Sequence, residues 1–190
     1  MKDVLVSKNE NAVPIYLMQS EDLKDWCAGA DDSANNWLKT HDFKAKPGES
    51  IVVPGPDGRI ACVVLGVSAP ISLWDVAGLP KSLPEGTYAL EVTYAQDQRD
   101  ACALGWLLGC YAYSKFKGAA EASIKARLVT PDGTDASIVQ AFADATALVR
   151  DLINAPPNEL GPTALSAAAK AVADQFGATF KETVGDDLLT

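Results

Sequence analysis

Histidine is almost absent from the sequence, and no two cysteines stand in a C-x-x-C spacing. A zinc site of the usual histidine and cysteine type therefore cannot be assembled, since it needs several such ligands together. The single histidine, His41, lies in the polar stretch "KTHDFK", which is typical of a surface residue. No G-x-S-x-G elbow, G-x-G-x-x-G loop or P-loop is present, so the sequence carries neither a serine-hydrolase nor a phosphate-binding signature.

Basic residues are also scarce, because 16 Lys and Arg stand against 25 Asp and Glu, which gives a net charge of -9. This balance argues against nucleic acid and against an anionic membrane surface as partners, since both are bound through clustered Lys and Arg. The longest uncharged apolar run, Ala101–Ser114, is well short of the roughly 20 residues of a membrane-spanning helix. We expect this run to form a buried helix, and we expect neither a nucleic-acid nor a membrane partner.

The four cysteines, at positions 27, 62, 102 and 110, are isolated, and three of them lie inside apolar runs. A free thiol in such a run behaves as a small hydrophobe. If Cys102 and Cys110 share one helix, they lie about 12 Å apart along its axis, which is too far for a disulfide. The sequence thus predicts reduced thiols and a cytoplasmic protein.

Strand-like and helical stretches alternate along the first 130 residues. Apolar runs predict strands at Val13–Met18, Ser50–Pro54 and Gly58–Ser68, and alternating outward and inward positions predict strands at Gly86–Tyr94 and Ile124–Thr130. Helices are expected at Ser33–Phe43 and at about Asp97–Phe116, and a short helix followed by a loop is expected over Ile71–Gly86. The run at Gly58–Ser68 suits a central strand that is buried on both faces. The alternation predicts an α/β domain with a mostly parallel or mixed sheet and helices on both faces.

After Pro131 the pattern becomes that of a long helix. Apolar residues recur at spacings of four, three, four and three, which predicts one core-facing stripe made of Ile138, Phe142, Ala145, Val149 and Leu152. Pro156 forces Ala155 away from helical geometry and ends the helix.

A second helix is predicted to begin at Gly161 and Pro162 and to end at Gly177, because these residues suit its N-cap, its first turn and its C-terminus. Its inward stripe is expected to consist of Leu165, Ala169, Val172 and Phe176. The stretch "ATFKETVG" predicts a strand after this helix, and "DDLLT" predicts the opening of a further helix.

Two other groups of residues could carry chemistry. The acidic pairs Asp31–Asp32, Glu21–Asp22 and Asp186–Asp187 could supply oxygen ligands to a metal, but each lies in a polar, turn-like or terminal stretch, so we interpret them as solvated surface. The aromatic residues Trp106, Tyr111, Tyr113 and Phe116 could line a pocket, but their helical setting is more typical of packing.

Two stretches, "ALGWLLGCYAYSKFK" (Ala103–Lys117) and "RDLINAPPNELGP", together resemble the leucyl aminopeptidase family, the two-metal cytosolic aminopeptidases. In that family an apolar helix ends in an aromatic and basic phrase, which appears here as Tyr111, Tyr113, Phe116 and Lys117, with Tyr113 and Ser114 departing from its commonest form. The family's linker pattern R-D-L-x-N-x-P-x-N-x-x-x-P is matched by Arg150, Asp151, Leu152, Asn154, Pro156, Asn158 and Pro162.

The resemblance implies a three-layer αβα domain of the macro-domain type, with a mixed sheet, over residues 1–132. It further implies a linker helix and proline joint over residues 133–160, and the first helix and strand of a second, catalytic α/β domain over residues 161–190. The parent enzyme is implied to be a homo-hexamer that releases N-terminal amino acids from peptides with two divalent metals, Mn or Zn. The partners of this chain would then be its own C-terminal catalytic domain and other subunits.

The catalytic phrases of that family, K-G-x-x-[FY]-D-[ST]-G-G and N-T-D-A-E-G-R, do not occur in these 190 residues. We therefore assign no catalytic or metal residue, and we expect the chain to be inactive alone, with a role in assembly or in shaping access to the active site. A second hypothesis is a stand-alone macro-like module that binds ADP-ribose or a related nucleotide, with "LGVSAP" (Leu65–Pro70) as its nearest phosphate loop. DNA binding, known for some bacterial members of the family, is opposed by the acidic balance.

Overall fold

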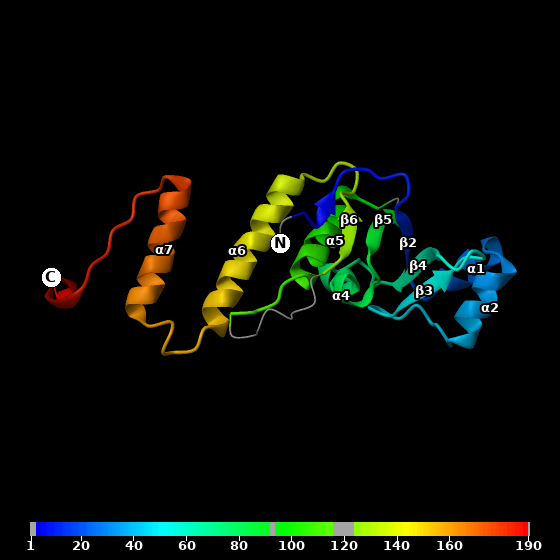
Figure 1. Cartoon of the computed structure of the whole chain (residues 1–190), viewed down its shortest axis with the longest axis horizontal. Coiled ribbons are helices and arrows are strands. Elements are labelled where there is room, and N and C mark those ends of the chain that lie inside the picture. Colours follow the sequence, from blue (N-terminus) through cyan, green and yellow to red (C-terminus); the bar gives the residue numbers. More distant parts are fainter. Residues whose placement is uncertain (1–2, 92–93, 116–123, 190) are drawn as a thin grey trace. The chain divides into compact units, whose positions relative to one another are not determined.

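The chain is seen in a computed structural model, which describes residues 3–91, 94–115 and 124–189 (Figure 1). It divides into two compact units, residues 1–147 and residues 148–190, and the boundary falls within one continuous helix, α6, which runs from Ala136 to Asn154. The first unit contains the sheet. The domain limits expected at residues 132 and 160 stay a prediction.

A mixed six-stranded sheet is the centre of the first unit. Its strands are β1 (Leu5–Val6), β2 (Val13–Met18), β3 (Ser50–Pro54), β4 (Ile60–Gly66), β5 (Gly86–Glu91) and β6 (Ala126–Val129). Their order is β1-β6-β5-β2-β4-β3, and every neighbouring pair is parallel except β3 and β4, which are antiparallel. The five predicted strands are confirmed: β2 and β3 have the predicted bounds, β4 and β6 are shorter at both ends, and β5 is described as Gly86–Glu91. The two-residue β1 was not predicted, because so short a run carries no periodicity.

The helices of the first unit connect these strands. They are α1 (Leu23–Gly29), α2 (Asp32–Thr40), α3 (Leu73–Val76), α4 (Leu79–Ser82) and α5 (Gln96–Gly109), followed by α6. The prediction of one short helix around Trp74 was incomplete, since α4 forms there as well, with Pro80 in its first turn, where a missing N–H costs nothing. The apolar helix ends at Gly109 rather than near Phe116, because Cys110 closes it with a tight final turn to the Leu107 carbonyl. Phe116 and Lys117 lie outside the described residues.

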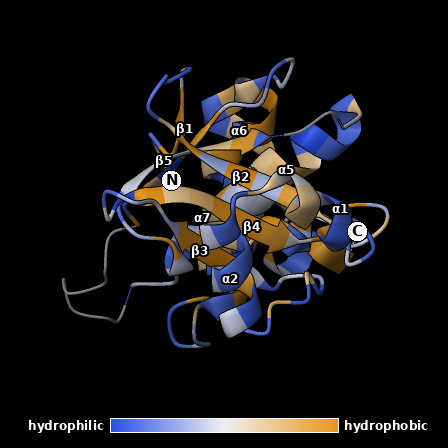
Figure 2. Ribbon diagram, turned by 90° about the vertical axis from the view of Figure 1, so that its right-hand side faces the viewer, coloured by the Kyte–Doolittle hydropathy of each residue, from blue (hydrophilic) through white to orange (hydrophobic). Residues whose placement is uncertain are grey.

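The two faces of the sheet are covered by different helices, so the unit has three layers. Val63 and Leu65 of β4 point to one face, where they pack with residues of α3, α4 and α5, including Val76, Leu79 and Trp106. Val64, between them in sequence, points to the other face and packs with Leu38 of α2. Figure 2 shows hydrophobic residues running along the strands between these layers. β4 is therefore a central strand buried on both faces, as predicted.

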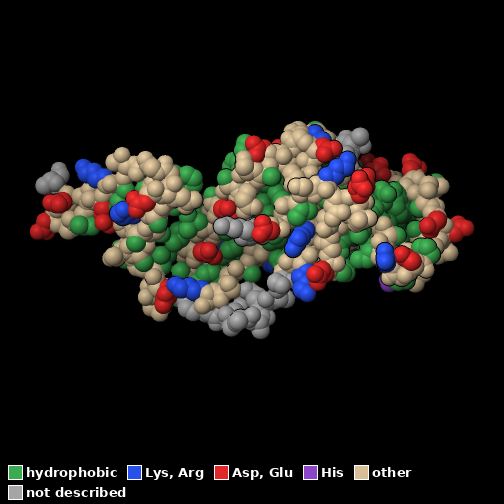
Figure 3. All heavy atoms as spheres, turned by 45° about the horizontal axis from the view of Figure 1, so that its top comes forward, with side chains coloured by type: hydrophobic (Ala, Val, Ile, Leu, Met, Phe, Trp, Pro, Cys, Tyr) green, Lys and Arg blue, Asp and Glu red, His purple; other side chains and the backbone are tan. Residues whose placement is uncertain are grey.

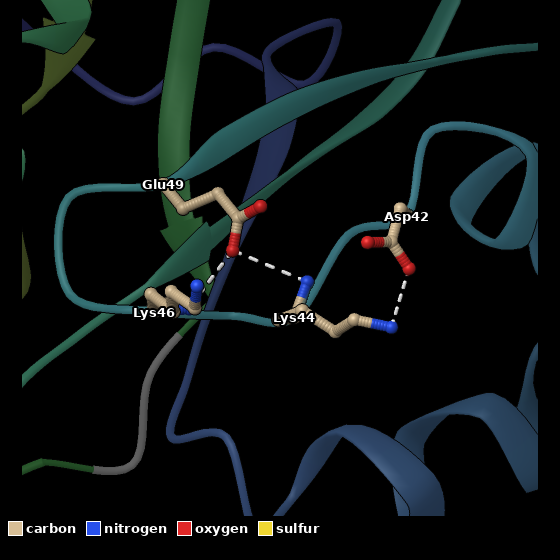
Figure 4. A network of polar contacts seen from close by, with 4 residues as sticks. All are labelled: Asp42, Lys44, Lys46 and Glu49. Carbon is tan, nitrogen blue, oxygen red and sulfur yellow. Dashed lines mark hydrogen bonds and ion pairs between the residues drawn. The ribbon is translucent and has the colours of Figure 1, made fainter.

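The turn that leads into β3 is held by a polar network (Figure 4). One carboxylate oxygen of Glu49 accepts hydrogen bonds from the backbone N–H groups of Lys44 and Lys46, at 3.1 and 3.0 Å. Lys44 also pairs with Asp42, and its hydrogen bond and charge lower the pKa of that carboxyl. Ala45, fully buried with a positive φ of 53°, is thereby fixed against β4 at Gly66.

Candidate functional site

The seven residues of the linker pattern form a helix-turn-helix joint in the second unit. Arg150, Asp151, Leu152 and Asn154 occupy the last turns of α6, and Pro162 is the first residue of α7 (Pro162–Phe176). Between the helices, the carbonyl of Pro156 accepts hydrogen bonds from the N–H groups of Glu159 and Leu160, at 2.8 and 3.0 Å. The seven residues thus lie along one stretch of backbone and shape a turn. Their functional role stays a prediction.

The apolar stripe predicted for α6 does lie on a single helix, but a neighbouring face of the same helix makes the contact with the core. Val139 and Ala143 are buried and pack on Ala103, Leu107 and Leu108 of α5. The predicted stripe is largely uncovered, since Ile138 is 54% exposed, Phe142 62% and Val149 53%. The expectation that this stripe faces a core was therefore wrong for these three residues. A shift of one position along a helix turns the contact face by about 100°.

The second helix, α7, buries none of its residues. Leu165 and Phe176 are exposed by 52% and 73%, and Ala169 and Val172 are also exposed, so the expectation of an inward stripe was wrong as well. Its predicted ends are confirmed, because Gly161 is the N-cap, and Gly177, in the left-handed conformation, ends the helix. The N–H of Ala178 donates to the carbonyl of Ala173 at 2.8 Å, as in a Schellman motif.

The strand predicted after α7 does not form. Residues 178–184 have no regular secondary structure, and Gly185–Leu189 make a 3₁₀ turn where the start of a helix was expected. A strand needs a neighbour to satisfy its backbone groups, and the described part of the second unit contains none. Figure 3 shows hydrophobic side chains exposed among the charged ones on the surface.

The loop after β4, the nearest candidate for a phosphate loop, is organised around Asp75 instead. One carboxylate oxygen of Asp75, which is buried, accepts hydrogen bonds from the Ser68 N–H, the Ser68 hydroxyl and the Ser72 N–H, at 3.0, 2.7 and 2.9 Å. Ser72 and Asp75 form the capping box of α3. The spacing S-x-x-D before an apolar residue is the sequence signal for such a box, although the box was not predicted. The N–H groups of Ser68 and Ser72 in this loop thus already donate to a carboxylate.

The other sequence candidates do not gather into a site. His41 is exposed and lies against the ring of Trp37, with ring centroids 4.5 Å apart. Asp31 is the N-cap of α2, because it accepts a hydrogen bond of 2.7 Å from the N–H of Ala34. Among the residues that the structure describes, no three His, Cys, Asp or Glu side chains lie together as a metal would require, so they do not fit a two-metal centre. The described helices also include none that is long and apolar enough to cross a membrane.

The aromatic residues of the apolar helix differ in their burial. Trp106 is fully buried and lies near Tyr88 of β5, with ring centroids 6.2 Å apart. Tyr111 and Tyr113 are half-buried and lie beyond the end of α5. The interpretation of Trp106 as a packing residue is confirmed.

A cavity that the sequence did not indicate lies beside the ends of β1, β5 and β6. It has a volume of about 450 Å³, and its lining includes Lys8, Glu91, Arg99 and Asp132. These residues come from four separate segments, so no local spacing could have brought them to notice.

The fold and the uncovered helices together define a class of protein, a mixed α/β domain joined by a linker helix to a further helical segment. The family model for the N-terminal domain of M17 aminopeptidases matches residues 13–131. The chain belongs to the M17 aminopeptidase family through this domain. This confirms the resemblance to leucyl aminopeptidases and the α/β fold.

Individual relatives agree with this assignment. A probable cytosol aminopeptidase of Rhizobium johnstonii is 33% identical over an alignment of 158 residues, and the match covers 70% of this chain and 32% of that protein. The crystal structure of a cytosol aminopeptidase from Coxiella burnetii is 31% identical with a TM-score of 0.87, and the match covers 98% of this chain and 41% of that one. The bottromycin maturation enzyme BotP in complex with Mn shares the fold, with a TM-score of 0.65 at 23% identity over 87% of this chain and 36% of that one. This chain spans about a third of the length of the curated relatives that it matches over most of its residues.

Proposed function

We propose that these residues are the non-catalytic N-terminal portion of a two-metal aminopeptidase, whose parent releases N-terminal amino acids from peptides. The proposal is supported by the family match and by one observation above all: α7 is amphipathic but buries nothing. A helix with an apolar face is stable in water when another surface covers that face. A catalytic domain of the parent is the partner that we propose for it.

We further propose that the exposed stripe of α6 serves assembly, as a contact with another subunit of a hexameric parent or with the edge of its active site. Contiguous exposed apolar side chains mark interaction surfaces. The two divalent metals, Mn or Zn, would be held by the catalytic domain, and no chemical step is assigned to residues 1–190. The names of the relatives and the unpaired cysteines support a cytoplasmic setting.

The first test compares activity with and without a catalytic domain. The purified 190-residue chain, given Mn or Zn, should not hydrolyse an aminoacyl anilide. A fusion of the chain to the catalytic part of the Coxiella burnetii relative should do so. Turnover by the 190-residue chain in proportion to its concentration would contradict the proposal.

The second test probes the helix faces in that fusion. Phe176→Asp should reduce the yield of active enzyme strongly, because it places a charge in the face that the catalytic domain would cover. Gln175→Asp, one residue away, is the matched control and should leave the yield unchanged. On α6, Phe142→Asp should shift the assembly toward smaller species in light scattering, whereas Ala141→Asp should not. If the two variants of either pair gave the same result, the role proposed for the apolar face of that helix would be ruled out.

The macro-like alternative predicts binding of ADP-ribose. The arrangement around Asp75 counts against it, because the amides of Ser68 and Ser72 already donate to a carboxylate. We expect no saturable binding of ADP-ribose in calorimetry. Duplex DNA at low salt should likewise leave the chain unbound, because of its net charge of -9.

A further inference from the structure

The cavity beside the ends of β1, β5 and β6 has the location of a ligand site. It is lined by the segments that directly follow β1 and β6 and by the last residues of β5. Figure 1 shows the loops after β1 and β6 running past the same end of the sheet. Ligands of open α/β sheets bind at the carboxyl ends of parallel strands. The volume of about 450 Å³ falls within the range of small-molecule sites.

Arg99 is the most unusual residue of this lining. It lies in the first turn of α5, where the helix dipole disfavours a positive charge. Its Nη2 donates to the neutral side-chain oxygen of Gln96 at 2.7 Å, while its Nε is buried without a hydrogen-bond partner. Among the described residues, no carboxylate forms an ion pair with it. Within the described part of the chain this half-buried guanidinium thus has no ion-pair partner, although such a group normally binds an anion.

The position of Arg99 is fixed by its neighbours. The side-chain N–H₂ of Gln96 donates to Asp100 at 2.8 Å and to Thr134 at 3.4 Å, which holds Gln96 between α5 and the loop after β6. Gly133 has a positive φ of 81°, and a side chain there would overlap the Gln96 oxygen that accepts from Arg99. The guanidinium is therefore held in place before any ligand arrives, which lowers the entropy cost of binding.

The remaining charges restrict the class of ligand. Glu10, Glu91 and Asp132 line the same cavity, so three carboxylates stand against the two cations Arg99 and Lys8. A simple anion such as phosphate would be repelled by this surplus of negative charge. A molecule with one carboxylate and one ammonium group could pair with both the cationic and the carboxylate side chains that line the cavity.

We propose that this cavity binds a small zwitterion with an apolar side chain, namely a free amino acid or a short peptide. The ligand carboxylate binds Arg99, and its ammonium group lies near the carboxylates of Glu91 and Asp132. Leu90 and Val129, which also line the cavity, offer apolar surface to the ligand side chain. This site does not depend on the proposed function, since none of its residues belongs to the linker joint or to the exposed stripe of α6.

The test is a titration of the ¹⁵N-labelled 190-residue chain followed by NMR. L-leucine and L-leucyl-L-leucine are added up to about 50 mM, which detects even millimolar affinity. Saturable chemical-shift changes are expected at residues 8–10, 89–91 and 129–132. Whichever of the two ligands binds more tightly shows whether the site takes an amino acid or a peptide. L-leucinamide lacks the carboxylate and N-acetyl-L-leucine lacks the ammonium group, so each should bind at least roughly tenfold more weakly.

Two variants test the assigned roles. Arg99→Gln should weaken L-leucine roughly tenfold, whereas Arg59→Gln, a surface arginine with an 89% exposed side chain, should leave binding unchanged. Glu91→Gln should weaken L-leucine but not N-acetyl-L-leucine, and it keeps the test decisive if Arg99→Gln lowers the thermal midpoint too far. Absence of saturable shifts, or equal binding of L-leucine, N-acetyl-L-leucine and inorganic phosphate, would overturn the proposal.

Discussion

Gly105 of α5 lies directly against the backbone of Leu73 of α3, and a side chain at Gly105 would overlap the Leu73 carbonyl oxygen. One turn later, Gly109 meets the carbonyl of Ala77 in the same way. The two glycines let α5 and α3 approach so closely that their backbones touch. This contact places Trp106, between them in sequence, in the centre of the core.

The first prediction concerns this contact. Gly105→Ala should lower the free energy of unfolding by about 2–3 kcal/mol, because the added methyl group forces the two backbones apart. Urea denaturation measures the change. Gly78→Ala is the matched control, since nothing lies within 4 Å of a methyl group there, and its effect should stay within about 0.5 kcal/mol. Equal effects would show that α3 and α5 are not in backbone contact.

The second prediction concerns which face of α6 meets the core. Val139→Ala should destabilise the chain by about 1–2 kcal/mol, because Val139 is buried against α5. Ile138→Ala removes more carbon from the adjacent position but should change the stability by less than about 0.5 kcal/mol, because Ile138 is largely exposed. If chemical denaturation showed a larger loss of stability for Ile138→Ala than for Val139→Ala, the stripe expected from the sequence would face the core after all.

The third prediction concerns the loop after β4. Asp75→Ala should cost about 2–4 kcal/mol of unfolding free energy, because it leaves the N–H groups of Ser68 and Ser72 without their acceptor. Asp144→Ala, an exposed acidic residue on α6, is the control and should be close to neutral. Thermal denaturation of both variants measures the difference, and similar midpoints would contradict the role of Asp75.

The fourth prediction concerns the thiols of Cys62 and Cys102, which are buried, and of Cys110, which is half-buried. Burial raises the pKa of Cys62 and of Cys110 to about 11, and that of Cys102 to about 12. At pH 8 their thiolate fractions then lie roughly a hundredfold or more below that of free cysteine. A colorimetric thiol reagent should therefore react slowly with these three in the native chain and rapidly with all four cysteines in denaturant. Rapid reaction of all four in the native chain would contradict this.

The same pKa values give stability a pH dependence. Because the folded state holds these thiol protons more tightly than the unfolded state, their contribution to stability is complete below the ordinary thiol pKa of 9.0. It is lost as the pH rises through about 11, and burial of Tyr88, whose pKa is also raised, adds to the loss. Unfolding free energies measured from pH 8 to pH 11 should fall steadily.

Strands β2 to β6 could be predicted from sequence because each is a continuous apolar run, as in β4, or an alternating one, as in β5, whereas the two-residue β1 could not. The ends of α7 could be predicted because Gly161, Pro162 and Gly177 act through their own backbone preferences. The contact face of α6 could not, since Ile138 and Val139 are equally apolar, and the choice between them depends on Leu107 and Leu108, about 30 residues earlier. The absence of a strand after α7 likewise depends on the lack of a neighbouring strand in the described part of the second unit, which local sequence does not encode.

The candidate sites divide in the same way. The linker residues were found because they are close together in the chain, and Asp75 could have been found from its S-x-x-D spacing with Ser72. The Arg99 cavity is different, because Lys8 and Asp132 are more than a hundred residues apart and meet only through the pairing of β1 with β6.

That pairing also orders events during synthesis. Leu5 and Val6 leave the ribosome before their strand partners, Leu128 and Val129, which emerge on the order of ten seconds later. During this interval β2, β3 and β4 can already associate, while the backbone amides and carbonyls of β1 are hydrogen-bonded to water. This edge of the sheet therefore closes only once residue 129 has left the ribosome.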